Sequence, residues 1–174
     1  CRFDPNGFTE VKYKGKWNFI NPQGELLWDK DIWFDYVCSF YNGFAWVKKE
    51  GKGYNFINTN GELLWKGNEW FSNIVSFDNG FAKVKIESKG WNFINTKGEL
   101  LWKGDKWFDR VYSFVNGFAC VKIEGRGWNF INTQGELVWK EYKWFDNAWN
   151  FSEGFAVVKL ESKYNYINTK GELL

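Results

Sequence analysis

The sequence of 174 residues contains no histidine and no methionine. Without imidazole, zinc sites with histidine ligands and catalysis by Ser–His or Cys–His pairs are excluded. No apolar run approaches the roughly 20 residues that a transmembrane helix needs, so we expect no membrane span. The cysteines, Cys1, Cys38 and Cys120, are too few and too far apart for a disulfide framework, and we expect Cys38 and Cys120 to be free thiols.

The missing methionine at position 1 predicts a processed product or a piece of a longer protein, with any signal peptide out of view. Cys1 then has two interpretations. It is either the lipidated first residue of a mature bacterial lipoprotein or the result of a cut through a repeat. The second is favoured because Phe3 falls in phase with the later copies described below.

A charge excess of either sign is also missing. The chain has 23 Lys and Arg against 21 Asp and Glu, which leaves a net charge of +2. A nucleic-acid-binding surface needs a clustered basic excess, so we expect no nucleic-acid partner. Aromatic residues make up 22% of the chain, and this content excludes disorder caused by low hydrophobicity.

Internal repetition dominates the sequence. A Gly-Phe pair begins at Gly43, Gly80, Gly117 and Gly154, each 37 residues after the one before. A Phe-Ile-Asn motif and a Trp-Phe pair keep the same period, which is typical of tandem structural repeats. We therefore expect residues 1–174 to form a single array of about 4.5 copies, cut from a longer one. The approximate copies are 3–39, 40–76, 77–113, 114–150 and 151–174.

The third copy shows which secondary structure to expect. Asn79-Gly80 between two aromatic-rich runs predicts a β-hairpin, and the apolar residues of 81–86 alternate with lysines as in a strand with one buried face. Residues 91–95 form a second strand, residues 100–102 a short third and residues 107–114 a fourth, with polar turns between them. All connections are short and no window has helical periodicity. The prediction is an all-β chain of antiparallel meanders with three or four strands per copy.

Comparison of the copies within this one chain separates constant positions from variable ones. A valine in the first strand, an isoleucine in the second and a glycine in the second turn are present in every copy, which indicates packing and backbone demands. Two positions vary without pattern, and we expect them to face solvent or a partner. One reads Cys38, Val75, Tyr112, Trp149, and the other reads Trp46, Lys83, Cys120, Val157.

A length difference between copies falls in one turn. The first and fifth copies lack the glycine that the others carry at Gly53, Gly90 and Gly127. An extra residue between paired strands must be absorbed as a bulge or a longer turn, and glycine tolerates such a site best.

The repeated motifs resemble those of the WG-repeat (KWG-repeat) family. From the end of the third copy into the fourth, the resemblance rests on Phe108-Asp109-Arg110-Val111, then Phe114, Gly117, Ala119 and Val121, then Trp128, Phe130, Ile131, Asn132 and Gly135. The glycine that follows the family's tryptophan is replaced by asparagine in every copy, and we expect asparagine to be accepted because it tolerates unusual backbone angles. The resemblance implies a β-rich tandem repeat, mostly bacterial, without an assigned catalytic activity. A weaker similarity links Gly15-Lys16-Trp17-Asn18-Phe19 to the hairpins of choline-binding and glucan-binding cell-wall repeats.

The recurring aromatic residues form three ladders: Trp33, Trp70, Trp107 and Trp144; Trp28, Trp65, Trp102 and Trp139; and Trp17, Tyr54, Trp91, Trp128 and Tyr164. These ladders have two interpretations. They fill the core between copies, which is favoured because a copy of this size has little else to bury, or one ladder lines a groove that stacks on sugars, cations or peptide side chains. The recurring Lys and Glu residues are expected to form a solvated face with weak cross-strand pairs. The candidate partner contacts are Trp46, Tyr112, Trp149, Tyr36 and Arg110. We expect no catalytic residue, no metal site and no cofactor, because no cluster of polar residues breaks the repeat.

For the whole array the sequence favours an open β-solenoid or superhelix, with propeller-like blades as the alternative. The expected function is a non-catalytic scaffold for protein or peptide interaction. The alternative is a glycan-binding or cell-wall-binding module of a bacterial surface protein. An enzyme is not expected. The sequence leans towards a bacterial cell-surface or secreted location and leaves the oligomeric state open.

Overall fold

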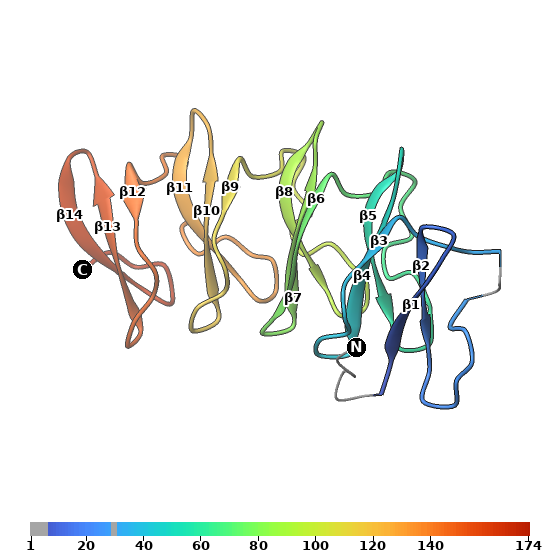
Figure 1. Cartoon of the computed structure of the whole chain (residues 1–174). Helices are drawn as coiled ribbons and strands as arrows, with labels where there is room; N and C mark the ends of the chain where they lie inside the picture. The colour runs from blue at the N-terminus through green and yellow to red at the C-terminus, as the bar shows by residue number, and fades with distance from the viewer. Residues whose placement is uncertain (1–6, 29–30) are drawn as a thin grey trace. The chain divides into compact units, whose positions relative to one another are not determined.

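The computed structural model describes residues 7–28 and 31–174, and it contains strands and turns but no helix in these ranges (Figure 1). The predictions for Cys1 and Phe3 lie outside the described residues. The chain divides into two compact units. The first comprises the chain up to Glu87 with Thr96–Glu99, and the second comprises Ser88–Asn95 and Leu100–Leu174.

Among the residues that the structure describes, the first unit has seven strands in three small antiparallel groups. Strands β1 (Thr9–Tyr13) and β2 (Lys16–Ile20) form one hairpin. Strands β3 (Tyr36–Val37), β4 (Phe44–Lys49) and β5 (Gly53–Asn58) form a sheet with β4 in the centre. Strand β6 (Asn73–Asp78) pairs with β7 (Phe81–Ile86) and has a register shift between Val75 and Asp78.

The second unit repeats the same pattern. It begins with β8 (Gly90–Asn95). Strands β9 (Arg110–Val111), β10 (Phe118–Ile123) and β11 (Gly127–Asn132) form a sheet with β10 in the centre. Strands β12 (Asn147–Ala148), β13 (Phe155–Leu160) and β14 (Lys163–Asn168) form the next, with β13 in the centre. The prediction of an all-β fold built from repeated antiparallel meanders is confirmed, whereas the open form of the whole array stays a prediction.

Two of the predicted strands are shorter than expected. The predicted third strand at 100–102 is a single bridge between Ile94 and Leu100, with the Leu101 amide donating to the Phe93 carbonyl at 2.8 Å. The predicted fourth strand at 107–114 contracts to β9 and an isolated bridge between Trp91 and Phe108. Segment 107–114 divides its backbone hydrogen bonds between two neighbours, since Phe108 bonds to Trp91 whereas Asp109 and Tyr112 bond to Lys122 and Cys120, so it does not form one continuous strand.

The Asn-Gly hairpins form as predicted. At the turn between residues 115 and 118, Asn116 has φ of 52° and Gly117 has φ of 84°. Positive φ at both central residues defines the two-residue turn whose twist matches the flanking strands. Val115 and Phe118 exchange both backbone hydrogen bonds, at 2.8 and 3.1 Å.

The length difference between copies lies in the turn that joins the two longest strands, as predicted. In the first copy Lys14 and Gly15 close β1 onto β2 with φ of 46° and 84°. In the fourth copy the additional Gly127 has φ of 108°, and a Cβ built there would lie 2.4 Å from the Phe145 carbonyl oxygen. This position therefore needs glycine both for its backbone angle and for the close approach of the next segment.

Aromatic rings join neighbouring copies in the core. Phe151, from the last copy, lies 4.4 Å from the ring of Phe118 and 4.8 Å from that of Phe130 in the copy before, measured between centroids. It is 2% exposed, and it belongs to one buried cluster with Phe130, Phe145 and Val158. The same arrangement recurs in the first unit, where Phe77 contacts the rings of Phe44 and Phe56.

The three aromatic ladders differ in burial. Trp144 and Trp107 of one ladder are buried, at 2% and 7% exposure, as the core interpretation predicts. Trp102 represents a second ladder. It is half-buried, packs on Phe108 and donates from Nε1 to the Lys106 carbonyl at 3.0 Å. The third ladder is the most open, and its last member, Tyr164, is 65% exposed.

The asparagines that replace the family's glycine have a different role from the one expected. None of Asn18, Asn55, Asn92 and Asn129 has a positive φ, and all four side chains are fully buried. Asn129 Oδ1 accepts hydrogen bonds from the Phe130 amide at 2.7 Å and the Trp139 amide at 3.1 Å, and its Nδ2 donates to the Trp139 carbonyl at 2.8 Å. The explanation by unusual backbone angles is therefore wrong. The amide ties the second strand to the segment ten residues later, where backbone groups would otherwise be buried without partners.

Candidate functional site

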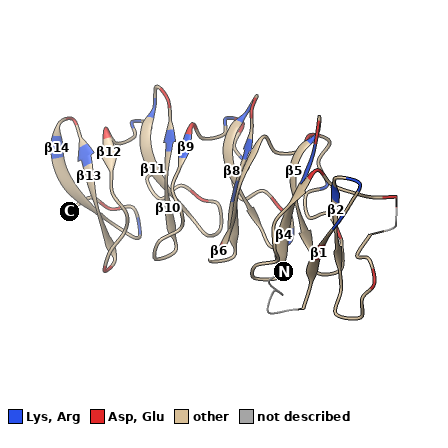
Figure 2. Cartoon of the chain, in the orientation of Figure 1, with Lys and Arg blue, Asp and Glu red and all other residues tan. Residues whose placement is uncertain are grey.

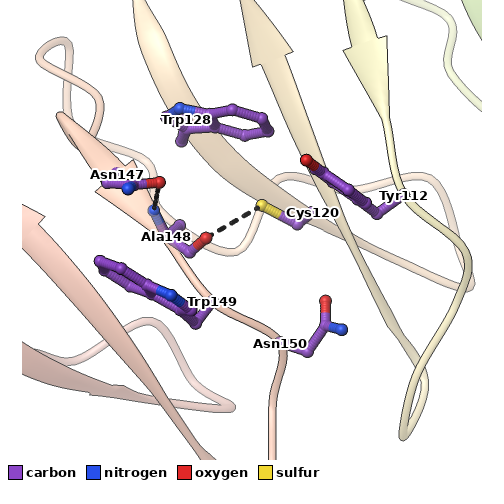
Figure 3. Close-up of a pocket in the computed structure, with 7 residues that line it drawn as sticks. All are labelled: Tyr112, Cys120, Trp128, Asn147, Ala148, Trp149 and Asn150. Atoms are coloured by element: carbon purple, nitrogen blue, oxygen red, sulfur yellow. Dashed lines mark hydrogen bonds between the residues drawn. The ribbon is translucent and has the colours of Figure 1, made fainter.

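A pocket of about 350 Å³ opens in the second unit between the sheet of β9–β11 and the sheet of β12–β14 (Figure 3). Tyr112, Cys120 and Trp128 line it from the first of these sheets. From the second sheet the lining comes from the short stretch Asn147–Asn150, which contributes Trp149. Figure 3 shows Trp128 and Trp149 on opposite sides of the Cys120–Ala148 contact.

Strand pairing brings the lining residues together. The Tyr112 amide donates to the Cys120 carbonyl at 2.9 Å, so these two residues face each other across neighbouring strands. In the pairing of β10 with β11, Cys120 lies opposite Phe130 and Lys122 lies opposite Trp128, so Trp128 is two residues further along the strand pair. The Cys120 thiol points at the following sheet and contacts the Ala148 carbonyl at 3.9 Å.

The pocket carries no charged side chain in its lining. Burial raises the pKa of the Cys120 thiol to about 12, so the floor of the pocket is a neutral, weakly polar sulfur at physiological pH. Polar groups are supplied by the amides of Asn147 and Asn150 at the rim. The rings of Tyr112 and Trp149 are 50% and 43% exposed, which leaves aromatic surface accessible to a ligand. This combination of apolar walls with a few polar groups suits an uncharged, partly aromatic group.

The structure places the five predicted contact residues in different surroundings. Tyr112 and Trp149 line the same pocket, although they come from different copies. Trp46 lies in β4, half-buried, with its ring 5.7 Å from that of Tyr54. Arg110 is exposed on β9 opposite Lys122 and is not part of the pocket lining.

Tyr36 lines a second pocket, of about 370 Å³, in the first unit. Its other lining residues are Lys14, Gly15, Lys16, Asp35, Lys48 and Glu50. Two of these charged side chains are paired with each other. Asp35 forms an ion pair with Lys16 and accepts from the Glu50 amide at 2.7 Å, and the hydrogen bond from Lys16 lowers the pKa of the Asp35 carboxyl. Asp109 holds the equivalent turn in the second unit through the Glu124 amide at 2.7 Å.

Sequence comparison within the chain missed one feature of the variable positions. The position occupied by Cys120 was expected to face solvent or a partner, but Cys120 is 2% exposed and its thiol lies against Ala148 of the following sheet. The two variable positions are in fact cross-strand neighbours. The backbone pairs are Cys38 with Trp46, Val75 with Lys83, Tyr112 with Cys120 and Trp149 with Val157. The two variable positions therefore form one variable site per sheet.

Four of the lysines that follow the constant valine, Lys12, Lys48, Lys122 and Lys159, lie over rings of the most open ladder. Lys12 lies 4.8 Å from the centroid of Trp17, and Lys48 lies 5.0 Å from that of Tyr54. In the second unit Lys122 lies 5.9 Å from Trp128. Figure 2 shows the charged residues gathered at the turns that join the long strands of each sheet, and several form ion pairs there, such as Lys122 with Glu124 at 3.0 Å. Such exposed pairs contribute about 0–1 kcal/mol each.

Within residues 7–28 and 31–174, no group of three or more Cys, Asp and Glu side chains is arranged to hold a metal ion. The described part of the chain also has no helix with the length and apolarity required to cross a bilayer.

The fold resembles several solved structures at low sequence identity. The computationally designed Ika8 protein aligns with 99% of this chain at 15% identity and a TM-score of 0.45. BamB from Moraxella catarrhalis aligns with 92% at 11% identity and a TM-score of 0.38, and the WD40 β-propeller domain of Doa1 aligns with 92% at 11% identity and a TM-score of 0.35. This chain spans 59%, 57% and 60% of these three structures, respectively. No curated protein matches the sequence.

A family model described as a WG-containing repeat matches residues 34–52, 108–126 and 128–164. The first match covers β3 and β4, the second covers β9 and β10, and the third extends from β11 to β14. These are the segments whose Phe-x-x-Gly-x-Ala-x-Val and Trp-x-Phe-Ile-Asn motifs build the recurring sheets. These three segments of the chain are therefore WG-containing repeats.

Proposed function

We propose that this chain is a non-catalytic repeat scaffold that binds a protein or peptide through the pocket lined by Tyr112, Trp128 and Trp149. The observation that carries the proposal is that residues from both variable positions meet at this pocket, while the frame around them is constant. Repeat proteins commonly bind partners through variable residues on a constant frame. The exposed Tyr and Trp rings are of the type enriched at interaction hot spots.

The lining also supports a binding role over a catalytic one. Its titratable groups are a tyrosine and a buried thiol whose pKa is raised to about 12. Acid–base and nucleophilic catalysis need groups whose pKa lies near the working pH. The recurring Asp residues hold turns, as Asp109 does through the Glu124 amide.

Binding of a glycan is the competing function, because exposed aromatic rings also stack on sugars. The ring faces of the repeated ladder favour the peptide. Lys48 and Lys122 already lie over the faces of Tyr54 and Trp128, where a sugar ring would have to stack. In addition, Tyr112 and Trp149 come from different copies and do not form a row of equivalent rings.

Selection from a random peptide display library tests the proposal. The immobilised chain should enrich peptides whose affinity falls about tenfold or more in Trp149→Ala, as expected for truncation of a hot-spot ring. Tyr142→Ala is the matched control, because this ring is 90% exposed and is not among the pocket-lining residues. Failure to enrich any peptide that depends on Trp149 would contradict the proposal. Binding of members of an oligosaccharide panel, lost in Trp149→Ala, would establish the glycan function instead.

A further inference from the structure

The equivalent sites of the two units differ in one respect that indicates the ligand. Cys38, Trp46 and Tyr54 of the first unit occupy the repeat positions of Tyr112, Cys120 and Trp128 in the second, since each pair is separated by two periods of 37 residues. On the facing strand, Ile74 and Val75 correspond to Ala148 and Trp149 in the same way.

In the first unit this site contains a tryptophan side chain of the protein itself, Trp46. The Trp46 ring packs edge-on against Tyr54, with centroids 5.7 Å apart and an interplanar angle of 71°. Its neighbour across the strands is the small Cys38, whose Sγ accepts from the Trp46 amide at 3.3 Å. The Trp46 side chain is half-buried.

In the second unit the large and small residues are exchanged. Cys120 replaces the tryptophan, and its short side chain stops at the Ala148 carbonyl. Tyr112 replaces the cysteine at the edge, where its ring lies 5.7 Å from that of Trp128 and 50% of its surface is exposed. Removing an indole from the centre of the site and adding a ring at its edge opens the pocket of about 350 Å³.

We infer that the pocket binds an aromatic side chain, tryptophan in particular, presented by a peptide. This inference rests on the proposed function and names the ligand that the pocket takes. A bound indole would lie where Trp46 lies in the first unit, edge-on to Trp128 as Trp46 is to Tyr54. The rims differ in a way that suits an external ligand, since Asn150 stands where the first unit has Ser76 and offers an amide to the peptide backbone.

The first experiment uses N-acetyl-5-fluorotryptophanamide as the probe and follows its fluorine resonance by NMR, because the 13 tryptophans of the chain would mask a fluorescence response. The full chain should broaden and shift the resonance. A tenfold excess of N-acetyl-leucinamide should not displace the probe, whereas N-acetyl-tryptophanamide should. No change of the resonance with the unmodified chain, or equal displacement by the leucine compound, would overturn the inference.

The chain supplies its own matched variants for the second experiment. The double variant Cys120→Trp with Tyr112→Cys installs the arrangement of the first unit in the second, and it should lower probe affinity about tenfold or more. The converse variant, Trp46→Cys with Cys38→Tyr, should open a second site and raise the number of bound probes from one to two. Because both variants use residues the fold already accepts at these positions, circular dichroism should remain unchanged.

The outcomes separate the two proposals. Full probe binding by a folded Cys120→Trp/Tyr112→Cys variant would overturn the aromatic-pocket inference. If that variant does not fold, Trp149→Ala takes its place, and unchanged probe binding there would overturn the inference equally. Selected peptides that require Trp149 but carry no aromatic residue would leave the scaffold function standing while contradicting the ligand named here. An absence of any selected peptide would contradict the scaffold function itself.

Discussion

The Asn129 side chain joins β11 to the segment 137–139 of the same copy by hydrogen bonds to Trp139. Its side chain is fully buried and satisfies two backbone amides and one carbonyl. The same bonds recur at Asn92, which accepts from the Trp102 amide at 3.0 Å and donates to its carbonyl at 3.0 Å. Asparagine was recognisable in the sequence as a departure from the family. Its partners were not, because they lie ten residues away and meet it only after the chain folds back.

Replacement of this amide is expected to be costly. Asn129→Ala leaves three buried backbone groups without partners, so the free energy of unfolding should fall by about 2–4 kcal/mol. Asn147→Ala is the control, because this exposed side chain bonds only the neighbouring Ala148 amide and should change stability by about 0.5 kcal/mol or less. Urea unfolding measures both. A similar loss of stability in the two variants would show that the buried hydrogen bonds of Asn129 stabilise the fold no more than the exposed hydrogen bond of Asn147.

The buried thiol of Cys120 makes stability depend on pH in the alkaline range. A cysteine in the unfolded chain ionises near its ordinary pKa of 9.0, whereas burial raises the pKa of Cys120 to about 12. Between these values the unfolded state gains a thiolate and the folded state does not. Stability is therefore fully present below pH 9 and falls as pH rises towards 12, by at most about 1.4 kcal/mol per pH unit.

Cys120→Val isolates this effect, because valine occupies the equivalent position at Val157. The free energy of unfolding of the wild-type chain, relative to the variant, should decrease progressively between pH 8 and pH 10.5. All other titratable groups are the same in the two proteins, so their contributions cancel in the difference. Urea titrations at four pH values measure it, and a difference independent of pH would contradict the burial of the thiol.

At the scale of the element, the turn between the long strands decides how closely consecutive segments pack. Gly127 and Gly125 lie in the same turn of the second unit, both with positive φ, at 108° and 81°. They differ in surroundings. A Cβ at Gly127 would meet the Phe145 carbonyl oxygen at 2.4 Å, whereas a Cβ at Gly125 has no atom within 4 Å. The length difference between copies showed where this turn lies, but only the folded chain shows what approaches it.

The two glycines provide a matched prediction. Gly125→Ala should cost about 1 kcal/mol, the penalty for a left-handed backbone alone. Gly127→Ala should cost more than about 2 kcal/mol, because the carbonyl and its hydrogen bond from Trp128 must also move. Denaturant titration of both variants gives the comparison. Equal losses of stability in the two variants would show that the Phe145 carbonyl moves away without destabilising the fold.

At the scale of the whole molecule, stability depends on rings that bridge consecutive copies. Phe151 packs on Phe118 and Phe130 of the preceding sheet, and the Asn116 amide group donates to its carbonyl at 3.0 Å. In a repeat protein each copy contacts only its neighbours, so the loss of such a ring should destabilise the two sheets that it joins.

Phe151→Ala should lower the free energy of unfolding by about 3–5 kcal/mol through the cavity it leaves. Amide hydrogen exchange should accelerate most in β10, β11, β13 and β14, with β1 and β2 affected least. Tyr142→Ala, at a ring that is 90% exposed, should leave the exchange pattern unchanged. Uniform acceleration across the chain would indicate one cooperative core and contradict the nearest-neighbour description.

Periodicity and turn residues were enough to predict the all-β character of the chain, the Asn-Gly hairpins and the position of the length difference. These are local properties, because two-residue turns and alternating strands depend on neighbours along the chain. Tyr112 and Trp149 were also identifiable, as aromatic residues at positions without a repeated requirement. Their meeting at one pocket, the burial of Cys120, and the exchange of large and small residues between Trp46 and Cys120 depend on contacts across strands and between copies. Such contacts are set by register and packing in three dimensions, which a linear pattern does not contain.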